Sequence, residues 1–339
     1  MTAIGIDTHK DSLAACRVDA LGTPLEERTF ANEPAAHQAL LAWIGDRRTV
    51  VGIEGSASFG AALARSLVAA GQTVREVPPV LSHRERGRTR RAGKSDPGDA
   101  LAIARVTVRE PDLPPVRLVD ASLELHLLVE AREDLVAEQT RVRNRLHADL
   151  RTLLPGYGAT AANLTAARHQ RTIGRSLRSL RGVQAELARE RLARLRRCGP
   201  EIAALTDRIE TRTAGHPLLA MPGVGSLVAA KVIGETGDPT RFRSADAFAA
   251  LAGVAPVPAS SGQTRHMRLH RGGNRQLNRA LYTIAMVQAV HHPPARAYLA
   301  RKRAEGKTGR DAIRALKRQL VRTVYRHLLE GARTTSMAA

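Results

Sequence analysis

Four acidic residues near the start of the chain have the types and positions of ligands for a divalent metal ion: Asp7, Glu54, Asp96 and Asp99. Unpaired carboxylates that converge repel one another unless a cation neutralises them, and their hard oxygen atoms select Mg²⁺ or Mn²⁺. Two such ions about 4 Å apart can stabilise both the attacking and the leaving oxygen of a phosphodiester. Together the four acids predict metal-assisted phosphoryl chemistry, with Mg²⁺ as cofactor and Mn²⁺ as an alternative.

The elements around these acids predict how they would meet. Strand-like runs and helical stretches follow in the order β-β-β-α-β-α-β, over residues 2–7, 12–19, 24–30, 37–44, 48–55, 59–70 and 72–77. This is the layout of an RNase H-like domain, in which the strand that ends at Asp7 lies beside the strand that ends at Glu54. Asp96 and Asp99 are three residues apart and therefore share a face at the start of the next helix.

Each acid also has a simpler explanation when it is taken singly. Asp96 precedes Pro97 and fits a helix N-cap. Asp7 and Glu54 fit ordinary acids at the ends of strands. The metal site is favoured because all four fall where a single fold would gather them.

A second candidate for chemistry is the segment VPASSGQTRHMRLHRGGNRQL at residues 257–277, which sets Ser260 and Ser261 in a basic tract. A serine hydroxyl is a weak nucleophile until its proton is removed, and no histidine–acid pair flanks these serines in the sequence. The predicted metal site is then the activator. Nearby cations could neutralise the phosphoryl oxygens or simply bind a nucleic-acid backbone: Arg265, Arg268 and Arg271. His266 and His270 could carry protons or merely be exposed.

Two further motifs predict contact with phosphates. The PGVG turn with Gly223 and Gly225 is typical of a helix-hairpin-helix, in which small residues bring backbone amides close to a phosphate, although it also fits a tight turn between packed helices. A basic tract precedes Asp96, and its cations are Arg84, Arg86, Arg88, Arg90, Arg91 and Lys94.

Charge and composition point to a polyanionic partner. The net charge is +21 and the isoelectric point about 11.3, whereas residues 1–80 hold seven Lys/Arg against nine Asp/Glu. Aromatic residues make up 3% of the chain, so contacts to phosphate and sugar should outweigh base stacking. Two cysteines and the absence of any run of about 18 apolar residues predict a cytoplasmic protein without a membrane segment. With nucleic acid as the expected partner, we expect it to be nucleoid-associated.

The middle of the chain predicts a helical arm. A proline-rich linker at Glu110–Arg117 precedes a long helix over 121–154, and a second long helix over 183–214 is expected to be interrupted near Cys198-Gly199-Pro200. Two long charged helices suggest a coiled coil or helical hairpin. Residues 168–197 contain ten arginines and two glutamates, which favours nucleic-acid contact over a solvated face.

Both ends of the chain resemble a known family. GIDTHKD, the IEGS strand end and KSDPGDA resemble the Asp-Glu-Asp-Asp set of the DEDD insertion-sequence transposases, also called the insertion-sequence one-ten family or bridge-RNA-guided recombinases. The segment from Phe242 to Leu281 is similar to the C-terminal transposase domain of that family. The resemblance implies an α/β plus all-α protein with three domains: a RuvC-like domain of RNase H fold (1–110), a helical coiled-coil arm (111–215) and a helical transposase domain with a helix-hairpin-helix (216–339).

The resemblance also implies an activity. Ser261 stands where the family has its nucleophile, with Ser260 as the adjacent competitor, and the implied partners are donor and target DNA, a structured non-coding guide RNA, and further subunits in a dimer or a tetramer. The expected function is RNA-guided DNA recombination through a phosphoserine intermediate. Two alternatives remain: a RuvC-like nuclease or junction resolvase that uses metal-activated water, and a non-catalytic protein that packs nucleic acid.

Overall fold

The computed structural model describes residues 2–46, 48–88, 96–116, 120–258, 267–269 and 272–338. Within these ranges it does not describe the side chains at 88, 96–97, 257–258, 267–269 and 335–338. The chain divides into two compact units, Met1–Asp120 and Ala121–Ala339, and each is considered by itself.

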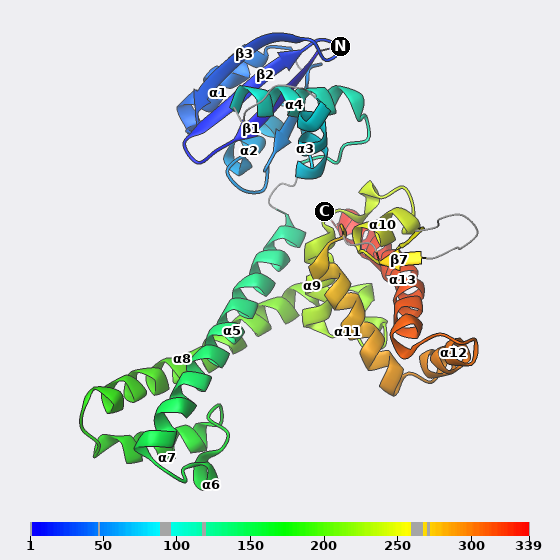
Figure 1. The fold of residues 1–339 in the computed structure, drawn as a ribbon. Helices are drawn as coiled ribbons and strands as arrows, with labels where there is room; N and C mark the ends of the chain where they lie inside the picture. Colours follow the sequence, from blue (N-terminus) through cyan, green and yellow to red (C-terminus); the bar gives the residue numbers. More distant parts are fainter. Residues whose placement is uncertain are drawn as a thin grey trace. The chain divides into compact units, whose positions relative to one another are not determined.

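Unit 1 is built on a five-stranded mixed sheet with the strand order β3-β2-β1-β4-β5. The strands are β1 (Ala3–Thr8), β2 (Ser12–Val18), β3 (Pro24–Ala31), β4 (Val50–Glu54) and β5 (Thr73–Glu76), and the helices are α1 (Pro34–Ile44), α2 (Ala61–Ala69), α3 (Pro79–Arg88) and α4 (Asp96–Arg109) (Figure 1). The first three strands are antiparallel, and β4 runs parallel to both β1 and β5. The β-β-β-α-β-α-β order predicted from the sequence is confirmed.

The two faces of this sheet carry different side chains, because alternate residues of a strand point to opposite sides. Ile4 and Ile6 of β1 pack with apolar residues of α1 and α2, such as Leu40 and Leu63. Ala3 packs in a separate cluster of mostly small residues that also includes Ala14, Cys16, Ala100 and Ala104. The side chains that face α4 are therefore mostly small.

Glycines bring α4 against the strands that carry the predicted metal ligands. A Cβ atom at Gly5 would lie 2.1 Å from the backbone nitrogen of Ala104 and 2.3 Å from the carbonyl oxygen of Ala100. A Cβ atom at Gly52 would lie 1.9 Å from Oγ1 of Thr107. Only residues without a side chain permit this approach, so the two glycines fix how closely α4 lies over β1 and β4.

Replacement of Gly5 tests this packing. Gly5→Ala is expected to lower the free energy of unfolding by about 1–3 kcal/mol, because the added methyl group overlaps backbone atoms that cannot move without displacing α4. Gly87→Ala in α3 is a matched control, since a Cβ there meets nothing within 4 Å, and helix propensity favours alanine. Denaturant titration of both variants gives the comparison, and equal stability of Gly5→Ala and the wild type would contradict the close approach.

Unit 2 begins with two long helices that pack side by side, α5 (Ala121–Leu153) and α8 (Val183–Thr213). Between them in sequence come α6 (Gly158–Ala161) and α7 (Ala167–Arg178), which lie at the end of the α5–α8 pair remote from α9 to α13 (Figure 1). Leu146 and Leu150 of α5, Ile173 and Leu177 of α7, and Leu192 of α8 share one apolar core. Two long helices were predicted, whereas α6 and α7 were not.

The predicted interruption of the second long helix is wrong. α8 continues through Pro200, although proline lacks a backbone N–H and its ring displaces the carbonyl four residues earlier, here that of Arg196. Arg196, Gly199 and Pro200 are exposed, so water can bind the released carbonyl. The buried side chain of Cys198 and the contact of Arg194 with Glu201 hold the two halves in line.

The rest of unit 2 is a helical cluster around one core. Its elements are η1 (Pro217–Ala220), α9 (Ser226–Thr236), η2 (Pro239–Arg241), α10 (Ala245–Leu251), β6 (Pro256–Pro258), β7 (Met267–Leu269), α11 (Arg275–His291), α12 (Pro293–Ala304) and α13 (Gly309–Ala338). Phe248, Leu281, Ile284, Val321 and Val324 are fully buried at its centre. No helix in the described part of the chain is long and apolar enough to span a membrane.

Candidate active site

Asp7 and Glu54 are direct partners in the parallel pairing of β1 with β4, as the sequence predicts. Paired residues on neighbouring strands point to the same face of a sheet, as do residues two apart on one strand. Asp7 therefore shares the face of Gly5, and Glu54 shares the face of Gly52. Both carboxylates lie at the strand ends on the side that α4 covers.

The helix α4 carries the other two predicted acids in its first turn. It begins at Asp96, whose side chain the structure does not describe. Asp99 is buried, with 4% of its surface exposed. Asp99 directly precedes Ala100, whose carbonyl is in close contact with Gly5. The packing of α4 on β1 thus places Asp99 on the same side of the sheet as Asp7 and Glu54.

Each of these three carboxylates has a polar partner in the structure. Nε2 of His9 lies 3.2 Å from Asp7, the Ser82 hydroxyl donates a hydrogen bond of 2.5 Å to Glu54, and Nη1 of Arg86 lies 2.9 Å from Oδ1 of Asp99. Ser82 and Arg86 both come from α3, so this helix borders the acidic site. The sequence did not single out His9 or Ser82.

The residues present fit a divalent cation in donor type and in placement on one face. Among the described side chains, no three acids, histidines or cysteines come close enough together to form a complete metal site. Asp96, the fourth predicted ligand, is not part of that description. The structure thus pairs Asp7 with Glu54 on neighbouring strands and places Asp99 on the same side of the sheet, without forming a three-acid cluster among the described residues. The position of the Asp96 carboxylate stays a prediction.

Glu76 is a further acid at the end of a parallel strand. Burial raises its pKa, the hydroxyl and amide of Ser56 act in the opposite direction, and the negative charge of Glu54 raises the pKa further. Its pairing with Ile53 places Glu76 on the face of α1 and α2, opposite to that of Glu54. We therefore do not count Glu76 with the metal ligands.

The predicted basic tract is only partly described. Arg84 is exposed on α3, and Arg86 points to Asp99. The backbone of Arg88 closes α3, but its side chain is not described, and Arg90, Arg91 and Lys94 lie outside the described residues. Helix α3 shows that the first half of the tract is helical, where the sequence predicted only a basic connection.

The predicted nucleophile and its neighbours also lie outside the described residues: Ser260, Ser261, Arg265, His266, His270 and Arg271. For Arg268 only the backbone is described, as part of β7. What the structure does describe is the base of this segment, where β6 pairs antiparallel with β7. A basic loop was predicted, and a short β pair is found within it.

The base of the segment at residues 257–277, hereafter the serine segment, is held by close contacts of the backbone. A Cβ atom at Gly273 would lie 2.3 Å from Cα of Gly253, so the backbone just before the segment contacts the backbone near its C-terminal end. Nδ2 of Asn278 donates to the carbonyls of Ala252 (2.8 Å) and Gly253 (3.1 Å). Lys317 in turn donates to Oδ1 of Asn278 at 2.8 Å, and burial lowers the pKa of this lysine.

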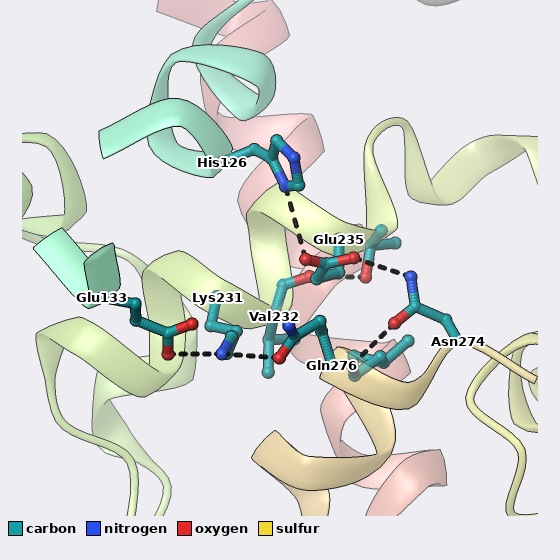
Figure 2. A network of polar contacts seen from close by, with 9 residues as sticks. His126, Glu133, Lys231, Val232, Glu235, Asn274 and Gln276 are labelled. Atoms are coloured by element: carbon teal, nitrogen blue, oxygen red, sulfur yellow. Dashed lines mark hydrogen bonds and ion pairs between the residues drawn. The ribbon is translucent and has the colours of Figure 1, made fainter. Parts of the chain in front are cut away.

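A polar network in unit 2 connects the same base to α5 and α9 (Figure 2). Asn274 caps α11 by accepting from the Leu277 amide, and its Nδ2 donates to Glu235 at 2.7 Å. Glu235 also lies 3.3 Å from Nδ1 of His126. One helical turn away, Lys231 donates to Glu133 at 2.5 Å and to Gln276 at 2.9 Å. Hydrogen bonds from three helices therefore fix the point where the serine segment joins α11.

The PGVG motif forms the turn before α9. Gly223 has a φ of 84°, which favours glycine, and a side chain there would meet Val287 and the Ile284 carbonyl of α11. Nε2 of Gln288 donates to the Pro222 carbonyl at 2.7 Å. Packing thus accounts for Gly223. Gly225 is exposed at the start of α9 with open space around it, so phosphate binding at this position remains a prediction.

Comparison with known proteins covers most of the chain. A family model described as Transposase matches residues 4–155, and the model of the Transposase IS116/IS110/IS902 family matches residues 215–300. The chain is 30% identical to the 42 kDa protein of insertion element IS900 from Mycobacterium paratuberculosis, over 99% of this chain and 98% of that one. It is 31% identical to the 43.6 kDa protein of insertion element IS110 from Streptomyces coelicolor, over 70% and 71%.

More distant similarity includes proteins of other names. The pilin gene-inverting protein of Moraxella bovis is 25% identical over 96% of this chain and 94% of its own. The RuvC of Thermus thermophilus in complex with a Holliday junction substrate aligns with 34% of this chain and 99% of its own, at 20% identity and a TM-score of 0.28. The similarity to the IS900 protein over nearly the full length of both chains and the two family matches establish that the chain belongs to the IS110 family of transposases, enzymes that act on DNA.

Proposed function

We propose that the protein is an RNA-guided DNA recombinase that excises and inserts its own mobile element. The observation that carries the proposal is the placement of Asp7, Glu54 and Asp99 on one face of the sheet in unit 1. The net charge of +21 supports a nucleic-acid substrate. The guide RNA is an inference from the family resemblance.

Asp7, Glu54, Asp96 and Asp99 would hold Mg²⁺, with Mn²⁺ as a substitute. When bound, the metal supplies positive charge that stabilises the oxygens of a phosphodiester undergoing displacement. His9 and Arg86 contact two of these carboxylates in the structure.

Ser261 is the proposed nucleophile, and Ser260 is its competitor. Oγ of Ser261 forms a bond to phosphorus while the bond from phosphorus to the leaving deoxyribose oxygen breaks. The serine loses a proton in this step, and the leaving oxygen gains one. The product is a phosphoserine diester with one DNA end. Attack by the hydroxyl of another DNA end reverses the step, so rejoining needs no ATP. Arg265, Arg268 and Arg271 are proposed to bind the phosphate oxygens.

The proposed domains divide this work. Residues 1–110 supply the metal ligands, and residues 111–215 form the coiled-coil arm. Residues 216–339 supply the serine and the helix-hairpin-helix, whose turn contains Gly223 and Gly225. Acids and serine must meet either within one chain or across two subunits. We propose a dimer that becomes a tetramer on paired DNAs.

A strand-exchange assay tests the proposal. The protein, purified with its bound RNA, is incubated with Mg²⁺ and two plasmids, one carrying the joined ends of the element and one carrying a target. Recombinant junctions, detected by sequencing, are expected with Mg²⁺ and are expected to disappear with EDTA. Linear cut products without junctions would instead support the metal-dependent nuclease.

Sequencing of the copurified RNA tests the guide. We expect one structured RNA species transcribed from the DNA that flanks the element's coding region. A mixture of cellular RNAs in proportion to their abundance would contradict guidance, because it is the result of charge alone.

A further inference from the structure

A hollow of about 550 Å³ in unit 2 is lined by Gly174 and four arginines, Arg171, Arg175, Arg178 and Arg196. Three of the arginines come from α7 and the fourth from α8, which packs against it. All four side chains are exposed to solvent. The hollow lies where the small helices cover the end of the α5–α8 pair, in a region where the sequence predicted nucleic-acid contact.

The spacing of α7 explains why three arginines face the same way. Positions 171, 175 and 178 differ by four and three residues and therefore share one face of a helix. The opposite face buries Gln170, Ile173 and Leu177. Burial of the apolar face fixes the orientation of the basic face without any contribution from the arginines themselves.

Gly174 admits the fourth arginine. A Cβ atom at this position would lie 2.5 Å from Nη2 of Arg196, so any larger residue would displace that guanidinium. Nη2 of Arg196 donates to the carbonyl of Gln170 at 2.7 Å, which anchors it at the edge of the hollow. Arg196 thus has a defined position across from the α7 face.

Three other arginines of α8 are engaged in the fold: Arg189, Arg191 and Arg194. Arg189 donates to the carbonyls of Leu177 (2.9 Å) and Leu180 (3.1 Å) at the end of α7. Arg191 pairs with Asp149, and Arg194 pairs with both Glu138 and Glu201. These contacts use Glu138 and Asp149 of α5 and Glu201 of α8.

The four arginines of the hollow have no such partner. In the described ranges none of them forms an ion pair with a carboxylate, whereas Arg191 and Arg194 do. Like charges gathered in one hollow repel each other, and an anion relieves the repulsion. Guanidinium groups present paired N–H donors that match the oxygens of a phosphate group.

We propose that this hollow is a binding site for backbone phosphates of a nucleic-acid strand, separate from the site of DNA cleavage. The inference rests on the proposed function, because it takes nucleic acid as the substrate class. Both DNA and RNA offer the same phosphodiester chemistry. The site would position a strand on the arm without reading its sequence.

The test compares the salt dependence of binding. A variant with Arg171, Arg175, Arg178 and Arg196 all changed to Gln is titrated with a labelled DNA duplex and, separately, with a labelled RNA hairpin, at several salt concentrations. Each lost phosphate contact reduces the slope of log K against log salt by about 1. We expect the slope to fall by about 2–4 for the probe that occupies the hollow, which identifies the strand as DNA or RNA.

The matched control removes the same charge from arginines that already pair with carboxylates: Arg28, Arg301, Arg314 and Arg326, all changed to Gln. This control is expected to change the slope by less than 1. A variant with Lys at the four hollow positions should restore most of the slope, which separates charge loss from misfolding. Equal slopes for the hollow variant, the control and the wild type, with both probes, would overturn the site.

Failure of this inference is distinct from failure of the proposed function. The binding measurement involves neither cleavage nor Ser261. A reduced slope with no strand exchange by the wild type would retain the phosphate site and reject the recombinase. Normal strand exchange by the wild type, with an unchanged slope in the hollow variant, would retain the recombinase and reject the phosphate site.

Discussion

Ser261→Ala is expected to abolish the covalent protein–DNA adduct and to lower both strand cleavage and strand exchange by about 10³-fold or more. The reason is that Ser261 is the proposed nucleophile of the phosphoserine bond, and removal of an enzymatic nucleophile has effects of this size. The adduct is measured on a denaturing gel with end-labelled DNA that contains the element's junction. DNA binding by the variant should equal that of the wild type, since one neutral hydroxyl is lost.

Ser260→Ala is the matched control, because it removes the same hydroxyl one residue away. It is expected to keep the adduct. If Ser261→Ala loses the adduct and strand exchange but still cuts DNA at the wild-type rate, metal-activated water does the cutting and the serine mechanism is wrong. If Ser260→Ala loses the adduct and Ser261→Ala keeps it, the assignment of the nucleophile moves by one residue.

Asp7→Asn is expected to lower Mg²⁺-dependent cleavage by about 10²-fold or more. The change keeps the size of the side chain but removes the charge that a divalent ion requires, and loss of several kcal/mol of transition-state stabilisation gives an effect of this size. Cleavage rates over a titration of Mg²⁺ and Mn²⁺ measure it. We expect part of the loss to be recovered at high Mn²⁺, because a weakened site can still bind at higher metal concentration.

Glu76→Gln is the control for this prediction, since it also neutralises an acid at a strand end but on the face away from α4. It is expected to cleave DNA at a rate close to that of the wild type. An unchanged rate of DNA cleavage by Asp7→Asn would contradict the proposal of a metal site at these strand ends. If Asp7→Asn and Asp99→Asn function as well as the wild type, and that function does not depend on Mg²⁺, the result would favour the alternative of a non-catalytic protein that packs nucleic acid.

The sheet and the placement of Asp7 and Glu54 could be predicted from the sequence because both depend on short-range patterns. Short runs typical of strands, broken by turn residues, define the strands, and the order of elements fixes which strands are neighbours. Two acids at the ends of adjacent parallel strands are then on the same edge. The pairing of Asp7 with Glu54 followed from these facts alone.

The remaining parts of the site depend on contacts between distant residues. The approach of α4, which brings in Asp99, depends on Gly5 and Gly52, whose role appears only when the helix lies over them. The network of Lys231, Glu235 and Asn274 joins three helices, and its members are ordinary polar residues in the sequence. α8 passes through Pro200 because that position faces solvent, which local propensity does not encode.

Mass spectrometry of the trapped adduct identifies the residue that is joined to DNA. The wild-type protein is incubated with Mg²⁺ and junction DNA, the complex is digested with protease and nuclease, and the modified peptide is sequenced. We expect a nucleotide phosphate attached to Oγ of Ser261. A nucleotide on any other residue, or efficient strand exchange without a covalent protein–DNA species, would contradict it.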